Sequence, residues 1–244
     1  MCFSAEADFV SGAVTGAIGI AALTQARGAR ELPLAVLPLA FGLHQITEGF
    51  VWLGLEGKSS AAVGDVATYL YLAFAWALLP LLAPLAVILV EPLRARRRWM
   101  AALVILGGLV GVLLAERLVN GAITSEITDR TITYGGAGDL GTWLTVGYVI
   151  ATCGSFVLSS RRYIVWFGVA NLAAVAVVAG VQAEALTSLW CVWAAIMSVL
   201  IFLQLRAWRR GDDVPGGPTT AWAIARTAGR TSDRTSGRTG AVIR

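Results

Sequence analysis

Residues 78–114 read LLPLLAPLAVILVEPLRARRRWMAALVILGGLVGVLL, two long apolar runs on either side of a short basic connection. A helix rises about 1.5 Å per residue, so roughly 20 apolar residues cross the hydrocarbon core of a bilayer, which is about 30 Å thick. Both runs reach that length when they are extended outward, to Val66–Val90 and Trp99–Val119. The stretch therefore predicts two transmembrane helices joined by arginines.

The composition of the whole chain agrees with this interpretation. The 244 residues are 57% hydrophobic and only 14% charged, whereas about a quarter of the residues of a soluble domain are charged. The mean hydropathy is +0.72. We therefore predict an all-α integral membrane bundle of about seven transmembrane helices within residues 1–210. Its other five spans are Phe9–Ala26, Leu32–Leu55, Trp143–Ser159, Tyr163–Gln182 and Leu186–Leu205.

Basic residues alternate along the predicted connections, and this alternation predicts the orientation. Cytoplasmic loops of membrane proteins are enriched in lysine and arginine. The second and fourth connections hold one base each, Lys58 and Arg130, and the sixth holds none. We therefore expect the N-terminus outside and the C-terminus in the cytoplasm. The basic residues on the predicted cytoplasmic side are Arg27, Arg30, Arg94, Arg96, Arg97, Arg98, Arg161, Arg162, Arg206, Arg209 and Arg210.

Two segments are expected to lie outside the bundle. Residues Ile123–Tyr134 are rich in β-branched side chains around a polar turn at Thr128–Arg130, which predicts a small outer β-hairpin in the fourth connection. Residues 211–244 combine Pro, Gly and a repeated Arg-Thr pair, so we expect a disordered cytoplasmic tail. That tail either contacts anionic lipid headgroups through its arginines or is simply solvated.

Small residues predict where helices approach closely. Gly12 and Gly16 form a small-xxx-small pair in the first span, and Gly107 and Gly111 form another in the fourth. Such pairs allow two helix backbones to come close together in lipid.

The second span carries the most informative polar residues. His44, Glu48 and Trp52 are spaced four apart and share one helical face, with Gln45 beside them. A charge in mid-membrane costs about 2.5–3.5 kcal/mol on insertion scales, so such residues are candidates for function. Three interpretations of His44 and Glu48 remain open. They form a hydrogen-bonded structural pair, they form a catalytic or substrate-orienting acid–base pair, or they belong to a metal site.

Other polar and aromatic residues fall at a similar depth in the predicted bundle, near its outer end. Together with the second span they predict a polar, aromatic-lined chamber that opens outward. In the metal version of this site the ligands are Cys2, His44, Glu48 and Cys191, whose thiolates favour zinc or copper. The further residues expected to line the chamber and bind a substrate are Trp52, Glu116, Asn120, Tyr148, Trp190 and Trp193.

Several stretches resemble a family of bacterial multi-pass membrane proteins, common in actinobacteria, that begin Met-Cys-Phe-Ser-Ala. The resemblance covers the whole predicted bundle and excludes the tail. It implies a protein of the bacterial plasma membrane and carries over no activity and no functional residue. The matching stretches are MCFSA at the start, HQITEGFVWLGL at His44–Leu55, YVIATCG at Tyr148–Gly154, WFGVANL at Trp166–Leu172 and SLWCVWAA at Ser188–Ala195.

The residue content argues against several classes of membrane protein. A retinal protein needs a Schiff-base lysine in a helix, and the only lysine, Lys58, lies in a connection. A ceramidase-type zinc hydrolase needs several histidines, and His44 is the only one. No P-loop, HExxH or kinase pattern occurs, and no nucleic-acid partner is expected.

Two classes of function remain. The first is a sensor, transporter component or metal-binding protein whose chamber takes a hydrophobic small molecule or an ion. The second is a membrane enzyme that acts on an isoprenoid or another lipid, in the manner of a small terpene cyclase. In that enzyme Glu48 donates a proton, His44 orients it, and the aromatic rings stabilise a cationic intermediate.

Overall fold

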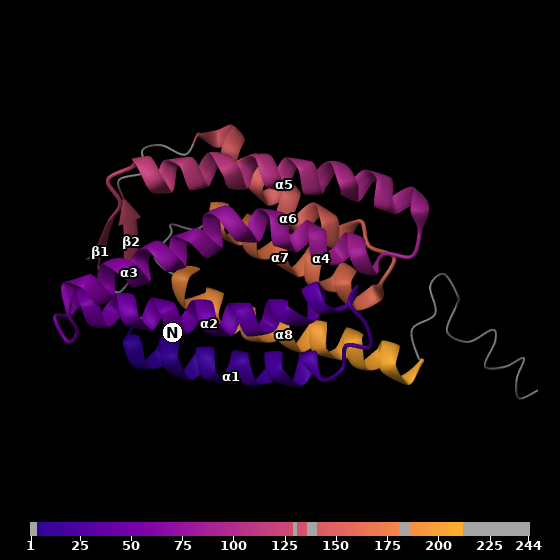
Figure 1. Cartoon of the computed structure of the whole chain (residues 1–244), viewed down its shortest axis with the longest axis horizontal. Helices are drawn as coiled ribbons and strands as arrows, with labels where there is room; N and C mark the ends of the chain where they lie inside the picture. The colour runs from indigo at the N-terminus through magenta and orange to yellow at the C-terminus, as the bar shows by residue number, and fades with distance from the viewer. Residues whose placement is uncertain (1–3, 129–130, 136–140, 181–185, 212–244) are drawn as a thin grey trace, which may run out of the picture.

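The computed structural model describes residues 4–128, 131–135, 141–180 and 186–211, with side chains for all of these except 177–180 and 186–194. Long helices run along one common axis, and a two-stranded sheet lies at one end (Figure 1). The tail and Cys2 lie outside the described residues. The elements are α1 (Ala5–Leu23), α2 (Leu32–Leu55), α3 (Ala61–Leu72), the π-helical segment η1 (Ala73–Leu78), α4 (Leu79–Val90), α5 (Arg94–Asn120), β1 (Thr124–Thr128), β2 (Thr131–Gly135), α6 (Thr142–Val157), α7 (Arg162–Gly180) and α8 (Leu186–Arg210).

The helix boundaries correct the predicted ones in two ways that matter. The Ser4 side chain caps α1 by accepting a hydrogen bond of 3.3 Å from the Ala7 N–H. The helix therefore begins at Ala5, four residues before the predicted start, and includes Asp8. At the opposite end of the bundle, α5 begins at Arg94, so the arginines expected in the third connection lie in the first turns of a helix instead.

Within the described residues, four helical rods are long and apolar enough to cross a membrane. They are α1, α2, the continuous rod Ala61–Val90 and α5, and α6 and the first part of α7 are shorter apolar helices. Large apolar side chains face outward: Ile105, Leu109 and Val112 of α5 are each at least 60% exposed. Polar side chains such as Gln45 and Ser155 are buried. An apolar exterior with polar side chains turned inward is the arrangement that lipid favours.

A proline widens the long rod Ala61–Val90 at its middle. The Leu79 N–H donates to the Phe74 carbonyl five residues back, which is the π-helical pattern. In the same pattern the Ala75 carbonyl would accept from the N–H of residue 80, but Pro80 has no N–H. This carbonyl instead accepts a 2.8 Å hydrogen bond from Tyr148 Oη of α6. The proline thus leaves one acceptor that a neighbouring helix satisfies.

Glycines allow the closest contacts between helices, as predicted. A Cβ at Gly12 would lie 2.8 Å from the Gly42 carbonyl oxygen, and a Cβ at Gly42 would lie 2.5 Å from the Gly16 nitrogen. Backbone therefore meets backbone between α1 and α2. Gly107 and Gly111 of α5 contact the carbonyls of Pro80 and Ala77 in the same way. The contact between Gly107 and the Pro80 carbonyl leaves no space for a methyl group.

The two ends of the bundle differ in structure. At one end, β1 and β2 pair antiparallel from Thr124 opposite Gly135 to Thr128 opposite Thr131, which confirms the predicted hairpin. The connection between α2 and α3 lies at the same end (Figure 1). At the other end, Arg209 of α8 donates to the Thr24 carbonyl, and Arg96 donates to the Leu158 carbonyl at 2.9 Å. The connection after α1 therefore meets the end of α8, and the start of α5 meets the end of α6.

The glycine contact between α5 and the π-helical segment generates a stability prediction. Gly107→Ala places a methyl group on the Pro80 carbonyl, so we expect it to lower the free energy of unfolding by about 1–3 kcal/mol. The matched control is Gly108→Ala. A Cβ there meets only Leu81 Cδ1, at 3.8 Å, so stability should be unchanged or slightly higher. Thermal unfolding of the full chain in detergent measures both, and equal effects would contradict the packing described.

Candidate functional site

Two carboxyl groups are buried against each other where α1 faces α2. Asp8 has no exposed surface and Glu48 is 4% exposed. The two groups are close enough to interact electrostatically. Glu48 was predicted from the sequence, whereas Asp8 was missed because the first span was expected to begin at Phe9. Its spacing to Gly12 and Thr15, four and then three residues, places it on the buried face of α1 and was the available signal.

Hydrogen-bond donors from α2, α3 and β2 surround this carboxyl pair. The hydroxyl groups of Tyr71 in α3 and Tyr134 in β2 interact with Glu48, and the Trp52 indole N–H faces Asp8. Trp52 Nε1 and Tyr134 Oη are buried and do not reach the geometry of a direct hydrogen bond. Burial and the nearby Glu48 carboxylate raise the pKa of Tyr134, so it stays a protonated donor. Neither tyrosine was singled out from the sequence.

Stacked aromatic rings lead away from the carboxyl pair. The His44 ring stacks on Tyr71 with centroids 4.0 Å apart and an interplanar angle of 11°. Tyr71 stacks in turn on Tyr134, at 5.0 Å and 18°. On its other side His44 contacts Phe74 of η1 at 4.8 Å, and Phe74 meets Phe41 edge to face at 6.2 Å. We call these five residues the aromatic column.

His44 and Glu48 therefore meet through Tyr71. Both contact Tyr71, His44 through its ring and Glu48 through the tyrosine hydroxyl. His44 Nδ1 is buried and has no hydrogen-bond partner. A neutral imidazole stacked between two rings contributes mainly a flat surface and one unused polar atom. The predicted shared face is present, but its contact to Glu48 runs through an aromatic ring of another helix.

The β-hairpin covers the carboxyl pair from the end of the bundle. Thr68 Oγ1 of α3 and Ser125 Oγ of β1 are 3.2 Å apart and hydrogen-bonded. Ile132 of β2 is buried in a small apolar cluster that includes Trp52 and Ala67. Together with Tyr134, these contacts hold the hairpin over α2 and α3. Access to Glu48 from this end requires the hairpin to move.

An apolar cavity of about 80 Å³ lies beyond the other end of the aromatic column. Phe41 lines it together with Phe156, Phe167, Thr152 and Tyr148. Tyr148 also borders a second cavity of about 240 Å³ between η1, α5 and α6. Thr152 of α6 is buried, and its hydroxyl donates a 2.8 Å hydrogen bond to the Tyr148 carbonyl. Glu48 is not among the residues that line either cavity.

A family described as a family of unknown function, DUF6629, matches residues 1–216. The chain belongs to this family. The match spans all the described elements, including the hairpin and the end of α8. No curated protein and no solved structure matches the chain.

The other residues predicted to form the site lie elsewhere or outside the described residues of this DUF6629 protein. Glu116 and Asn120 are exposed at the end of α5 and bond to each other at 3.2 Å, away from the carboxyl pair. Gln45 is buried on α2, one turn before Glu48. The side chains of Trp190, Cys191 and Trp193, like Cys2, lie outside the described ones. Within the described residues no three His, Cys, Asp or Glu side chains gather to hold a metal, so a zinc or copper site depends on Cys2 and Cys191.

The bond between Tyr148 and the π-helical segment can be tested in this DUF6629 protein by a double-mutant cycle. Tyr148→Phe leaves the Ala75 carbonyl without its donor, and we expect a loss of about 1–2 kcal/mol in the free energy of unfolding. Pro80→Ala restores an N–H at residue 80, so Tyr148→Phe should cost less in that background. Tyr69→Phe, at an exposed phenol of α3, is the control. An equal loss in both backgrounds would show that Pro80 does not create the orphan carbonyl.

Proposed function

We propose that this chain is a multi-pass protein of the bacterial plasma membrane with about seven spans. In this topology the N-terminus and the hairpin lie outside, and the end of α8 lies in the cytoplasm. Four apolar rods and the outward apolar surface support membrane insertion. The distribution of arginines supports this orientation. Arginines lie in or next to the connections after α1, α4 and α6 and at the end of α8, all at one end of the bundle. Cytoplasmic segments of membrane proteins are enriched in such residues.

Cysteine labelling in intact cells tests this orientation. In a background with Cys2, Cys153 and Cys191 changed to serine, Lys58→Cys should react with a membrane-impermeant maleimide added outside. Arg162→Cys should react only after the cells are permeabilised, because the arginine end faces the cytoplasm in this topology. Both positions are exposed, so accessibility within the protein does not limit the reaction. Labelling of Arg162→Cys from outside would overturn the orientation.

The proposed activity is the binding of a hydrophobic organic cation at the Asp8–Glu48 pair, as part of a sensor or transporter. The pair itself carries this proposal, because two buried carboxyl groups share one site and lie close enough to interact electrostatically. Two carboxylates cannot both stay charged in such a place without a proton or another cation. The pair is therefore a site where protons and a cationic ligand compete.

The neighbouring groups suit a cation with an apolar body. The faces of aromatic rings attract cations, and the aromatic column offers such faces beside Glu48. Trp52 Nε1 and Tyr134 Oη are donors without a direct partner, so they can orient carboxylate oxygens around a bound ligand. A ligand from outside would displace Tyr134 with the hairpin. In the metal version of the site, Cys2 and Cys191 would join His44 and Glu48.

The enzyme hypothesis has less support. A proton donor for an isoprenoid substrate must reach the substrate directly. Glu48 does not line the apolar cavity, because Phe41 and Phe74 lie between that cavity and His44. The order of these rings favours binding at the carboxyl pair over acid catalysis in the cavity.

Calorimetric titration of the full chain in lipid nanodiscs tests cation binding, with phenyltrimethylammonium as the probe and empty nanodiscs as the blank. We expect saturable binding that weakens as the pH falls, because protonation removes the carboxylate charge. Glu48→Gln or Asp8→Asn should weaken it about 30-fold or more, as expected when one partner of a buried charge pair is lost.

Two controls make this titration decisive. Glu116→Gln removes an exposed carboxylate that accepts a hydrogen bond from Asn120, away from the Asp8–Glu48 pair. This variant should bind the probe as tightly as the parent chain does. The neutral isostere tert-butylbenzene should bind far more weakly than the cation. Absence of saturable binding to the folded parent chain, or equal binding of the neutral isostere, would overturn the proposed function.

A further inference from the structure

The helices around the buried carboxyl pair are held together by contacts between their backbones. Where α1 meets α2, this contact is made at Gly12 and Gly42. The helices α2 and α3 meet in the same way, because a Cβ at Gly54 would lie 2.5 Å from the Gly64 Cα. We expect helices in such close contact to stay together, since separating them would lose dispersion contacts along both backbones.

The β-hairpin, by contrast, is attached to these helices through a few side chains. The hydroxyl groups of Thr68 and Ser125 are hydrogen-bonded at 3.2 Å, and the Tyr134 ring stacks on Tyr71 with centroids 5.0 Å apart. In the two described strands Ile132 is buried, and the other residues are exposed or half-buried. A two-stranded hairpin is only marginally stable by itself. Its position over the carboxyl pair therefore depends on these anchors.

The two strands are better connected to each other than to the helices. They pair antiparallel over five positions, from Thr124 opposite Gly135 to Thr128 opposite Thr131. Residues 121–123, which form neither helix nor strand, connect the end of α5 to β1. Segments with few buried contacts to the rest of a protein open at a lower free-energy cost than the core. The hairpin can therefore leave the helices as one unit while the pairing between its strands is kept.

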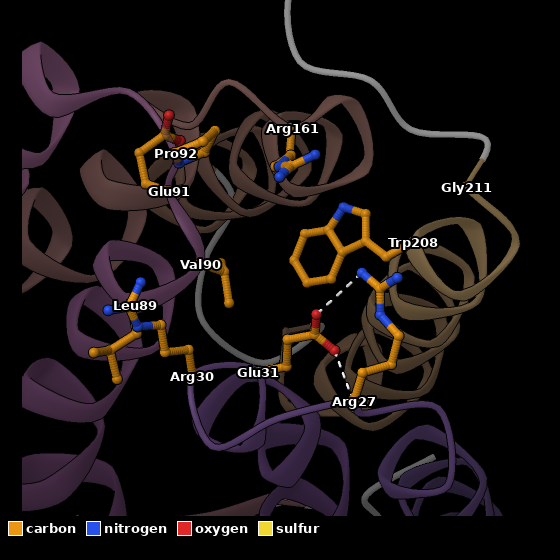
Figure 2. A pocket seen from close by; sticks show the side chains of 10 residues that line it. All are labelled: Arg27, Arg30, Glu31, Leu89, Val90, Glu91, Pro92, Arg161, Trp208 and Gly211. Atoms are coloured by element: carbon orange, nitrogen blue, oxygen red, sulfur yellow. Dashed lines mark hydrogen bonds and ion pairs between the residues drawn. The ribbon is translucent and has the colours of Figure 1, made fainter.

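The opposite end of the bundle is joined by charged side chains. Glu31 forms an ion pair with Arg27 at 3.4 Å in the connection between α1 and α2. The Arg161 guanidinium, after α6, lies 5.0 Å from the centre of the Trp208 ring of α8. Figure 2 shows these side chains around a pocket of about 490 Å³, whose lining also includes Arg30. The anchors of the hairpin are instead a pair of hydroxyl groups, two stacked rings and one isoleucine.

We propose that the β-hairpin is a gate, which opens as one unit and admits the organic cation to the carboxyl pair. The identity of what enters rests on the proposed function, whereas the movement itself does not. Tyr134 couples the gate to the site, because its ring stacks on Tyr71 and its hydroxyl interacts with Glu48. Opening uncovers Glu48, which is 4% exposed when the hairpin is closed. Closing returns the ring to the site, where its face stabilises a bound cation.

An engineered disulfide across the gate tests this movement. In the background without the three native cysteines, Thr68→Cys and Ser125→Cys are combined. The hydroxyl oxygens there are 3.2 Å apart, and a disulfide joins sulfur atoms about 2 Å apart, so oxidation should close the gate covalently. Reduction reopens it, and the two single variants treated with the same oxidant are the matched controls.

The readout is modification of the native carboxyl groups by the water-soluble carbodiimide 1-ethyl-3-(3-dimethylaminopropyl)carbodiimide, followed by peptide mass spectrometry of the full chain in nanodiscs. We expect oxidation to slow modification of Asp8 and Glu48 roughly tenfold or more, because the reagent reaches them only when the gate is open. Glu116 is exposed, so its modification should be the same in the oxidised and reduced chains. Equal modification of Asp8 and Glu48 in both chains would overturn the gate.

A second pair of variants needs no disulfide. Ile132→Ala removes the buried anchor of the hairpin and should speed modification of Glu48 roughly fivefold or more. Ile127→Ala is the matched control, because Ile127 lies opposite Ile132 in the hairpin but is 40% exposed. Equal rates in these two variants would also overturn the gate.

Binding of phenyltrimethylammonium, measured on the same chains, separates the gate from the proposed function. Slow binding to the oxidised chain and normal binding to the reduced chain support both. Modification that depends on oxidation, without binding of the cation to the reduced chain, would support the gate and overturn the proposed function. Binding of the cation at the same rate to both chains would overturn the hairpin as its entrance.

Discussion

Close backbone contact between α1 and α2 is the constraint on which the candidate site depends. Gly12 and Gly42 bring the two helices to a distance that no side chain larger than hydrogen would allow. One turn from Gly12 in α1 lies Asp8, and about two turns from Gly42 in α2 lies Glu48. The glycines thus force two acids into one buried place. In lipid or in a protein interior such a pair is costly unless a proton or another cation compensates its charge.

The long rod Ala61–Val90 connects this site to the rest of the bundle. Its widened segment, η1, presents Phe74 to His44 and the Ala75 carbonyl to Tyr148. The same segment leaves the carbonyls of Ala77 and Pro80 against the glycines of α5. This part of the rod therefore contacts α2, α5 and α6. Segments of π-helix often occur at functional sites, because they change the direction of side chains within an otherwise regular helix.

The two ends of the molecule have opposite chemistry. The hairpin end holds buried acids under Tyr134, and the other end holds arginines around Trp208. In the proposed topology these ends lie at opposite faces of the membrane. The function proposed above places a cation at the first end. That proposal follows from the rule that a charge near lipid is kept only where a partner of opposite charge compensates it.

The sequence alone determined the helical class, the β-hairpin, the close-packed glycine pairs and the presence of Glu48 within an apolar helix, because these depend on local hydropathy, β-branching and spacing. It did not reveal Asp8, since a polar residue near the chain start looks like part of a solvated terminus until Ser4 is seen to cap the helix before it. Tyr71 and Tyr134 were invisible for another reason: they reach Glu48 from α3 and β2, and no periodicity relates those elements to α2. Only the tertiary structure could place Tyr71 between His44 and Tyr134, or bring Arg30 and Arg161 to the same pocket. These contacts depend on how whole helices pack, and packing is decided by contacts between residues that lie far apart in the chain.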